Sequence, residues 1–198
     1  EGNISTIAGT GDSDHDGDGG PALEATFRDP NALASDKKGN IFVADTANNL
    51  IRKIDTKGIV TTFAGNGEHA DSGDGGSALE AAIRSMDDIE FSPQGELHIL
   101  GTNTHKVRKI TQDGKIVSVV GKGYAGFFGD DGPATKAMLK NPAAISFDSK
   151  GNLYIADMGN NRIRKVDKKG IITTFAGTGK FGWGRTGETV EIYLQDFP

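Results

Sequence analysis

Cysteine is absent from the 198 residues, which excludes a disulfide framework and a thiolate nucleophile. Long apolar runs are lacking too, because stretches such as 59–60 and 171–172 fall far short of the ~20 residues that a membrane-spanning helix needs. Basic residues are not in excess, since 22 Lys and Arg stand against 27 Asp and Glu. A net charge of -5 disfavours a surface that tracks phosphates. We therefore expect no nucleic acid partner and no membrane insertion, and we favour a secreted or cell-surface location.

A repeat of constant length dominates what is present. The segment Gly-Asn-Ile-Phe-Val-Ala-Asp at 39–45 recurs in similar form at 95–101 and 151–157, so each copy begins 56 positions after the previous one. Within each copy, four short β-branched or aromatic segments are separated by turns rich in Gly, Asn, Asp and Lys. This pattern is typical of a four-stranded antiparallel meander.

The repeat predicts an all-β fold made of β-propeller blades. One such sheet has two faces to bury and cannot do so alone, so the copies must pack face to face around an axis. We treat the chain as one propeller segment, residues 1–198, with complete blades at about 31–65, 87–121 and 143–177. Residues 3–8 match only the outer strand of a blade, and the tail 178–198 matches only a connector.

The repeated residues resemble a known family. Residues 142–166 read Pro-Ala-Ala-Ile-Ser-Phe-Asp-Ser-Lys-Gly-Asn-Leu-Tyr-Ile-Ala-Asp-Met-Gly-Asn-Asn-Arg-Ile-Arg-Lys-Val, which resembles an NHL repeat almost position by position. The Gly-Asp-Gly-Gly connectors are similar to those of bacterial NHL-repeat proteins and of the NHL propeller of teneurins. This resemblance implies a platform for binding, since NHL propellers bind proteins or RNA, act as sensor domains, and occasionally are lyases. The middle copy departs from the pattern at Met86, Gly101 and His105, and we expect a looser turn there.

Asp45 and Asp157 recur, each followed by an arginine, Arg52 or Arg164. A catalytic role is one interpretation, but catalytic groups in a repeat array normally occur once. A carboxylate that enters a tight turn accepts backbone N–H groups and pairs with an arginine on the next strand. We therefore expect a structural role for both aspartates and assign no catalytic residue.

The first connector resembles a calcium loop. Asp12, Asp14 and Asp16 alternate as the oxygen ligands of an EF-hand do, with Gly17 at the sixth position. The twelfth position, however, is Leu23 instead of a bidentate glutamate. The sequence leaves two readings open, weak calcium binding through the three aspartates and a solvated acidic turn that holds no cofactor.

The connectors are also the predicted partner-binding surface, because loops of about twenty residues in a compact domain tend to be functional. We expect them to gather on one face around the propeller axis, where Asp18, Asp74 and Asp130 would form an acidic rim. The late connectors add aromatic residues without a strand context, which are candidates for an exposed contact patch: Phe127, Phe128 and Trp183.

Function is predicted as a non-enzymatic binding or scaffold module that presents its connector face to a protein or carbohydrate. The alternative is a fragment of a metal-dependent lyase or hydrolase of propeller fold. The four histidines lie at four different phases of the repeat and form no symmetric ligand set, which disfavours this alternative. Three blades make only an arc, so we also expect either a longer ring or self-association into a dimeric six-bladed ring.

Overall fold

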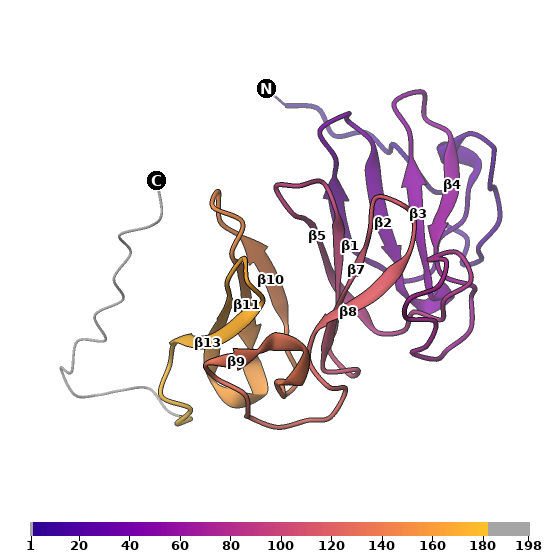
Figure 1. Cartoon of the computed structure of the whole chain (residues 1–198). Helices are drawn as coiled ribbons and strands as arrows, with labels where there is room; N and C mark the ends of the chain where they lie inside the picture. Colours follow the sequence, from indigo (N-terminus) through magenta and orange to yellow (C-terminus); the bar gives the residue numbers. More distant parts are fainter. Residues whose placement is uncertain (1, 182–198) are drawn as a thin grey trace.

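The computed structural model describes residues 2–181 and folds them into three antiparallel sheets that stand side by side in an arc (Figure 1). Each sheet is a meander in which consecutive strands pair, and we call the sheets blades 1, 2 and 3. Blade 1 consists of β1 (Pro30–Ser35), β2 (Ile41–Asp45), β3 (Leu50–Ile54) and β4 (Val60–Ala64). Blade 2 consists of β5 (Met86–Phe91), β6 (Leu97–Gly101), β7 (Lys106–Ile110) and β8 (Ile116–Val120). Blade 3 consists of β10 (Ala144–Phe147), β11 (Leu153–Asp157), β12 (Arg162–Val166) and β13 (Ile171–Ala176). The predicted all-β propeller blades are confirmed.

The turn between the second and third strand is built alike in every blade. It needs one residue in the left-handed region, and Asn49 (φ 55°) and Asn161 (φ 50°) take that conformation after the 3₁₀ turns η2 (Thr46–Asn48) and η4 (Met158–Asn160). Blade 2 lacks the 3₁₀ turn, yet His105 adopts the same conformation with φ 53°. The looser turn that we expected in blade 2 therefore consists only of the loss of the 3₁₀ turn.

The blades pack through apolar faces, and we call the two packed interfaces seam 1–2 and seam 2–3. Seam 1–2 buries Ala44, Ile51 and Ala64 of blade 1 in one cluster with Ile89 and other aliphatic residues of blade 2. Seam 2–3 repeats this arrangement between blades 2 and 3. The strands β1, β5 and β10 are neighbours along the inner side of the arc. Burial of these faces is the main stabilising contribution, at about 25 cal/mol per Å² of apolar surface.

Each long connector runs along the outer edge of the blade that follows it. Gly19 N–H donates to the carbonyl oxygen of Val60 in β4 (2.8 Å), and Val60 N–H donates back to Gly20 (3.0 Å). In blade 3 the same contact forms a fifth strand, β9 (Gly132–Pro133), paired with β13. The connectors thus cover strand edges that would otherwise expose unpaired backbone groups.

The position of the connectors corrects one prediction. Asp18, Asp74 and Asp130 do not gather at a rim around the axis, because each contacts the outer strands of its own blade. The physical reason is the open edge of the outer strand, whose backbone groups hold the connector through hydrogen bonds. Short 3₁₀ turns complete two of the connectors, η1 (Ala22–Glu24) and η3 (Ala134–Lys136). None of the helices within residues 2–181 has the length and apolar character to span a bilayer.

Candidate functional site

A buried arginine lies at the centre of each connector. In blade 1 this is Arg52 on β3, whose side chain is fully buried. Its guanidinium donates to Asp18 Oδ1 through Nε (3.1 Å) and Nη2 (2.7 Å), and to the carbonyl oxygens of His15 (3.2 Å) and Asp16 (3.4 Å). In blade 2, Arg108 donates to Asp74 (2.8 Å), Asp71 (3.2 Å) and the carbonyl oxygen of Ser72 (2.8 Å). In blade 3, Arg164 donates to Asp130 through Nη2 (2.7 Å) and to the carbonyl oxygen of Met138 (3.5 Å). The planar fork of donors is what allows one side chain to fix a whole loop.

The three connector aspartates each join this arginine to the outer strand. The second carboxylate oxygen accepts from Thr62 N–H (2.8 Å) at Asp18 and from Ser118 N–H (3.0 Å) at Asp74. Although burial acts to raise the pKa of both aspartates, these hydrogen bonds and the paired arginine hold the pKa below its ordinary value. At Asp130 the acceptor role is the same, with Thr174 Oγ1 at 2.6 Å. This geometry explains why the aspartates recur, and their role in partner binding stays a prediction.

The strand aspartates meet the same arginines from the other side. Asp45 Oδ2 lies 3.7 Å from Arg52, and Asp157 Oδ2 lies 3.4 Å from Arg164, with all four side chains fully buried. Burial raises the pKa of Asp45, partly offset by hydrogen bonds from Asn48 and the Arg28 backbone. Each aspartate therefore lies inside the fold, as the structural interpretation of the sequence predicted.

Blade 2 keeps the arginine although it has lost the strand aspartate. Gly101 stands where blades 1 and 3 have Asp45 and Asp157. Asp71 from the connector replaces the missing carboxylate, with Oδ1 3.2 Å from Arg108, and its second oxygen pairs with Lys106 at 2.8 Å. A buried arginine needs a counter-charge, and the chain supplies it from a different segment.

The structure does not bring Asp12, Asp14 and Asp16 together as a group that could hold calcium. Within residues 2–181 no group of three or more acidic or histidine side chains is placed to hold a metal ion. Asp14 Oδ1 accepts from the backbone N–H of the next residue, His15 (2.8 Å), and Asp12 contacts Thr10. The carbonyl groups of His15 and Asp16 in this loop instead accept hydrogen bonds from the guanidinium of Arg52.

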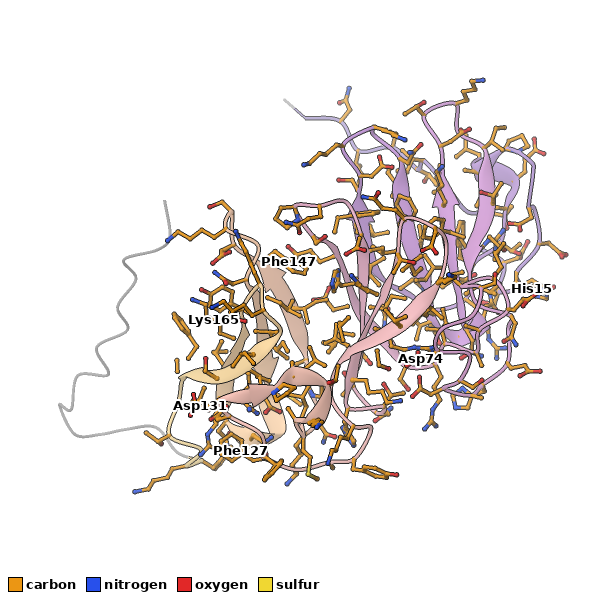
Figure 2. The ribbon with its side chains drawn as sticks, in the orientation of Figure 1. His15, Asp74, Phe127, Asp131, Phe147 and Lys165 are labelled. Carbon is orange, nitrogen blue, oxygen red and sulfur yellow. The ribbon has the colours of Figure 1, made fainter. Side chains whose placement is uncertain are left out.

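Three aromatic side chains on the third connector are exposed to solvent. Tyr124, Phe127 and Phe128 expose 70%, 44% and 61% of their surface. We call these three residues the aromatic patch. Figure 2 shows Phe127 and the connector residue Asp131 at blade 3. Phe127 and Phe128 were predicted from the sequence, whereas Tyr124 was missed. Tyr124 could have been found because it lies three residues before Phe127 in the same connector. Trp183, the third predicted aromatic, lies outside the described residues.

The backbone under the aromatic patch is firmly held. Gly126 N–H donates to the carbonyl oxygen of Leu139 (3.0 Å), and Asn160 Nδ2 donates to the carbonyl oxygen of Gly126 (2.7 Å). Phe128 and Met138 form an antiparallel bridge. The ring of Phe127 lies 3.8 Å from the guanidinium carbon of Arg162, a cation–π contact. The patch is thus presented on an ordered loop.

Among the connectors that precede blades 1, 2 and 3, only the third carries aromatic residues at these positions. At the three equivalent positions connector 2 has Glu68, Asp71 and Ser72, and connector 1 has Asp12, His15 and Asp16. Phe127 lies 4.8 Å from the guanidinium carbon of Arg164, so this position contacts the buried arginine of its blade, as Asp71 does in blade 2. Tyr124 and Phe128, by contrast, have no aromatic counterpart in connectors 1 and 2. That contrast makes the patch the candidate functional site.

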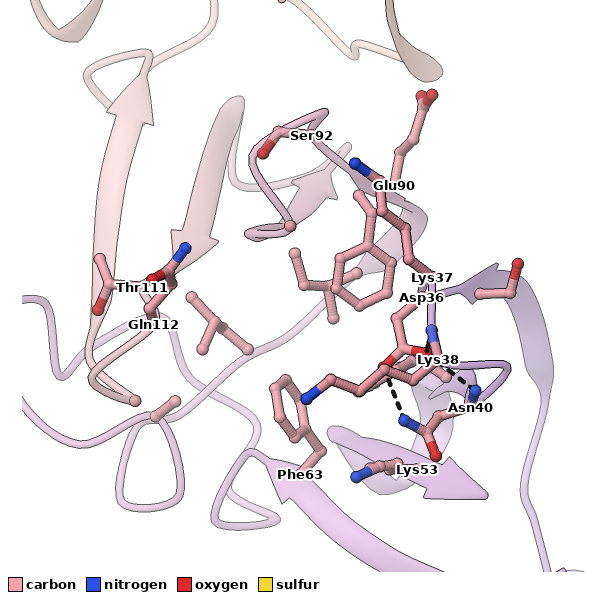
Figure 3. Close-up of a pocket in the computed structure, with 18 of the residues that line it drawn as sticks. Asp36, Lys37, Lys38, Asn40, Lys53, Phe63, Glu90, Ser92, Thr111 and Gln112 are labelled. Atoms are coloured by element: carbon pink, nitrogen blue, oxygen red, sulfur yellow. Dashed lines mark hydrogen bonds between the residues drawn. The ribbon is translucent and has the colours of Figure 1, made fainter. Parts of the chain in front are cut away.

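A groove with a volume of about 1140 Å³ lies between blades 1 and 2. Figure 3 shows Phe63 beside a polar rim that includes Asp36, Lys53 and Asn40. Asp36 accepts from Asn40 Nδ2 (2.7 Å), and the same pair recurs in blade 3 as Asp148 and Asn152 (2.6 Å). A second groove of about 590 Å³ lies between blades 2 and 3 at repeat-equivalent residues. Because they recur, we attribute the grooves to blade packing.

The fold and the repeats define the class of protein, an arc of NHL-type propeller blades. The Teneurin NHL domain family model matches residues 2–72 and 125–186, and the chain belongs to that family. Teneurin-m of Drosophila melanogaster is 32% identical over 181 residues, covering 84% of this chain. The chain spans only 6% of the length of that relative.

Solved structures with the same fold are more distant in sequence. A Bacteroides thetaiotaomicron protein of unknown function matches with a TM-score of 0.57 at 21% identity, covering 74% of this chain and 35% of that one. An auxiliary nutrient binding protein of Bacteroides ovatus matches with a TM-score of 0.56 at 20% identity, covering 77% and 37%. At this identity the likeness shows the fold alone.

Proposed function

We propose that this chain is a non-enzymatic binding module that docks a protein partner through the aromatic patch on its third connector. The observation that carries the proposal is the exposure of Tyr124 (70%) and Phe128 (61%) on a loop held by backbone hydrogen bonds. Tyrosine and phenylalanine are enriched at protein interfaces, and aromatic residues presented by an ordered backbone lose little conformational entropy on binding.

The docking surface that we propose is smaller than the connector face that the sequence predicted. Asp18, Asp74 and Asp130 are each joined to a buried arginine, so we assign them the task of holding the connectors in place. Within the aromatic patch, Phe127 also lies on the buried Arg164 (4.8 Å), so we assign docking mainly to Tyr124 and Phe128. The docking surface is therefore one connector at blade 3 rather than a ring of connectors.

Selection of displayed random peptides on the immobilised chain tests the proposal. Peptides that bind should lose about 2 kcal/mol, roughly thirtyfold in Kd, when Tyr124→Ser and Phe128→Ser are combined, as expected for aromatic hot spots. The matched control changes the equivalent residues of connector 2, Glu68→Ser with Ser72→Ala, and should leave binding intact.

Two results would overturn this function. Peptide binding that survives the patch variant would place the docking surface elsewhere, and a glycan-array signal lost in that variant would assign the patch to sugar. Turnover of a lactone substrate by the purified chain, together with stoichiometric zinc or calcium, would favour the metal-dependent lyase or hydrolase instead.

A further inference from the structure

The connectors that precede the three blades differ in charge. They are the equivalent stretches 9–29, 65–85 and 121–141, each 56 positions after the one before. The first contains six acidic residues and one basic residue, the second four and one, and the third two and three. The formal charge thus changes from -5 and -3 to +1, in a chain whose net charge is -5. Of these three connectors, the one that carries the aromatic patch is the one that can attract an anion.

Two exposed lysines of the third connector lie close to the aromatic patch along the backbone. Lys122 comes two residues before Tyr124. Lys140 follows Leu139, which forms a bridge with Ala125 in the middle of the patch. Within residues 2–181, neither lysine forms an ion pair with a carboxylate. Both ammonium groups are therefore available to a negatively charged partner.

Blade 3 adds a cation whose counter-charge has been replaced by an aromatic ring. In blade 2, Lys106 at the start of β7 pairs with the connector carboxylate Asp71 at 2.8 Å. The equivalent residues of blade 3 are Arg162 and Phe127. The guanidinium carbon of Arg162 lies 3.8 Å from the ring centroid of Phe127. In the part of the chain that the structure describes, no carboxylate forms an ion pair with Arg162. The positive charge has been kept while its partner has been lost.

The guanidinium of Arg162 is held in a fixed position. Nη1 donates to the carbonyl oxygen of Asn160 (2.9 Å), and Nη2 donates to the carbonyl oxygen of Thr178 (3.1 Å). A guanidinium has more N–H donors than these two bonds use, and the side chain is partly exposed. A planar cation that is already oriented, with donors to spare, suits a carboxylate oxygen.

We propose that the protein segment docked by the aromatic patch is acidic. Its carboxylates pair with Arg162, Lys122 and Lys140, while an apolar side chain packs against Tyr124 and Phe128. This inference rests on the proposed function and narrows it to one partner chemistry. A short acidic segment needs only the local positive charge of the third connector. A longer phosphate backbone would also meet connectors 1 and 2, whose charges of -5 and -3 repel it.

Three displayed peptide libraries test the partner chemistry. Each library places random apolar residues between flanking positions that are Asp or Glu in the first library, Asn or Gln in the second, and Lys or Arg in the third. Selection on the immobilised chain should enrich binders from the acidic library only. Raising the ionic strength from about 0.15 M to about 1 M shortens the Debye length from about 8 Å to about 3 Å, and it should weaken these binders at least about tenfold.

Charge variants of the chain identify the residues that bind the acidic peptides. Lys122→Glu combined with Lys140→Glu should weaken binding at least about tenfold, because two attractive pairs become repulsive. Arg162→Gln should also weaken binding, and Arg162→Lys should retain part of the affinity because it keeps the charge without the planar fork. Lys57→Glu, at an exposed lysine of the turn between β3 and β4, is the matched control and should leave binding unchanged. Circular dichroism checks that each variant is folded.

The outcomes separate a failure of this inference from a failure of the proposed function. Binders from the neutral or basic library that depend on Tyr124 and Phe128 would overturn the acidic partner and leave the docking function standing. Acidic binders that tolerate all the charge variants would overturn it as well. A single-stranded RNA that competes with the selected peptides would assign the patch to nucleic acid. If no library yields binders that depend on the patch, the proposed function fails and this inference fails with it.

Discussion

Seam 1–2 and seam 2–3 share one geometry and differ in chemistry. Phe42 and Phe91 meet edge to face at 4.9 Å with an interplanar angle of 72°, and the equivalent pair in seam 2–3, His98 and Phe147, meets at 4.8 Å and 70°. The backbone repeat thus fixes where the rings lie, while the side chain decides whether the position can be charged. The difference teaches that one backbone geometry can hold an apolar seam and a titratable one, and we expect only seam 2–3 to respond to pH.

Inner-strand residues add to this difference. Where blade 1 has Ala32 and Ala34, blade 2 has Asp88 and Glu90. Asp88 Oδ2 accepts from Ile145 N–H of blade 3 at 2.8 Å, and Glu90 Oε1 accepts from Phe147 N–H at 3.3 Å. Seam 2–3 is therefore joined by carboxylates, whereas the same positions of seam 1–2 are apolar.

The largest effect is expected from removing the ring at the centre of seam 1–2. Phe42 is buried and contacts both Phe63 (4.8 Å between centroids) and Phe91 (4.9 Å). Phe42→Ala leaves a cavity there and should lower the free energy of unfolding by about 3–5 kcal/mol. Urea denaturation at neutral pH measures this loss. Leu79→Ala, at an exposed connector position, is the control and should change stability little.

His98 should make seam 2–3 sensitive to acid. Burial lowers the pKa of His98 from 6.5 to about 4, so the folded state resists the proton that the unfolded chain accepts. Neutral His98 makes its full contribution to the free energy of unfolding above pH 6.5. This contribution decreases by about 3 kcal/mol in total as the pH drops toward 4. His98→Phe, which copies Phe42, should abolish that loss in urea denaturation between pH 7 and pH 4.

Two further variants sharpen this prediction. Phe42→His should introduce acid sensitivity into seam 1–2, because it places the same ring at the equivalent position. His69→Gln changes an exposed histidine of connector 2 and should leave the pH dependence as it is. An unchanged loss of stability in His98→Phe would show that another group is responsible.

A smaller effect of opposite sign is expected from the carboxylates of seam 2–3. Burial raises the pKa of Asp88 and of Glu90, and the charge of Asp88 raises that of Glu90 further. The two carboxylates bind protons more readily in the folded chain than in the unfolded chain. Their contribution to stability therefore rises as the pH falls through the raised pKa. The double variant Asp88→Asn with Glu90→Gln keeps a side-chain oxygen that can accept a hydrogen bond at each position and removes the negative charges.

This double variant should be more stable than the wild type at pH 7 by less than about 1 kcal/mol. It should also lack the gain in stability on mild acidification, which thermal unfolding at several pH values would measure. Ala32→Ser, at the position equivalent to Asp88 in blade 1, is a control that adds no titratable group. A double variant less stable than the wild type at pH 7 would contradict the prediction.

Much of the fold was predictable from local patterns, because strands and turns depend on short stretches of sequence. The constant 56-residue spacing predicted the three sheets, and the stretches rich in Gly, Asn, Asp and Lys predicted the turns between their strands. The candidate site was only partly predictable. Phe127 and Phe128 were found as aromatic residues in a connector, whereas nothing in residues 12–16 reveals that their carbonyl groups accept hydrogen bonds from Arg52.

The sequence by itself determined the repeat, the blades and the places where the three copies differ, since these depend on residue identity and spacing alone. The tertiary structure decided which side chains meet across segments: Asp71 replacing the carboxylate lost at Gly101, the connectors covering outer edges instead of the axis, and Arg162 lying over the ring of Phe127. The physical reason is that burial and ion pairing depend on neighbours brought together by the packing of blades, which spacing along the chain does not specify.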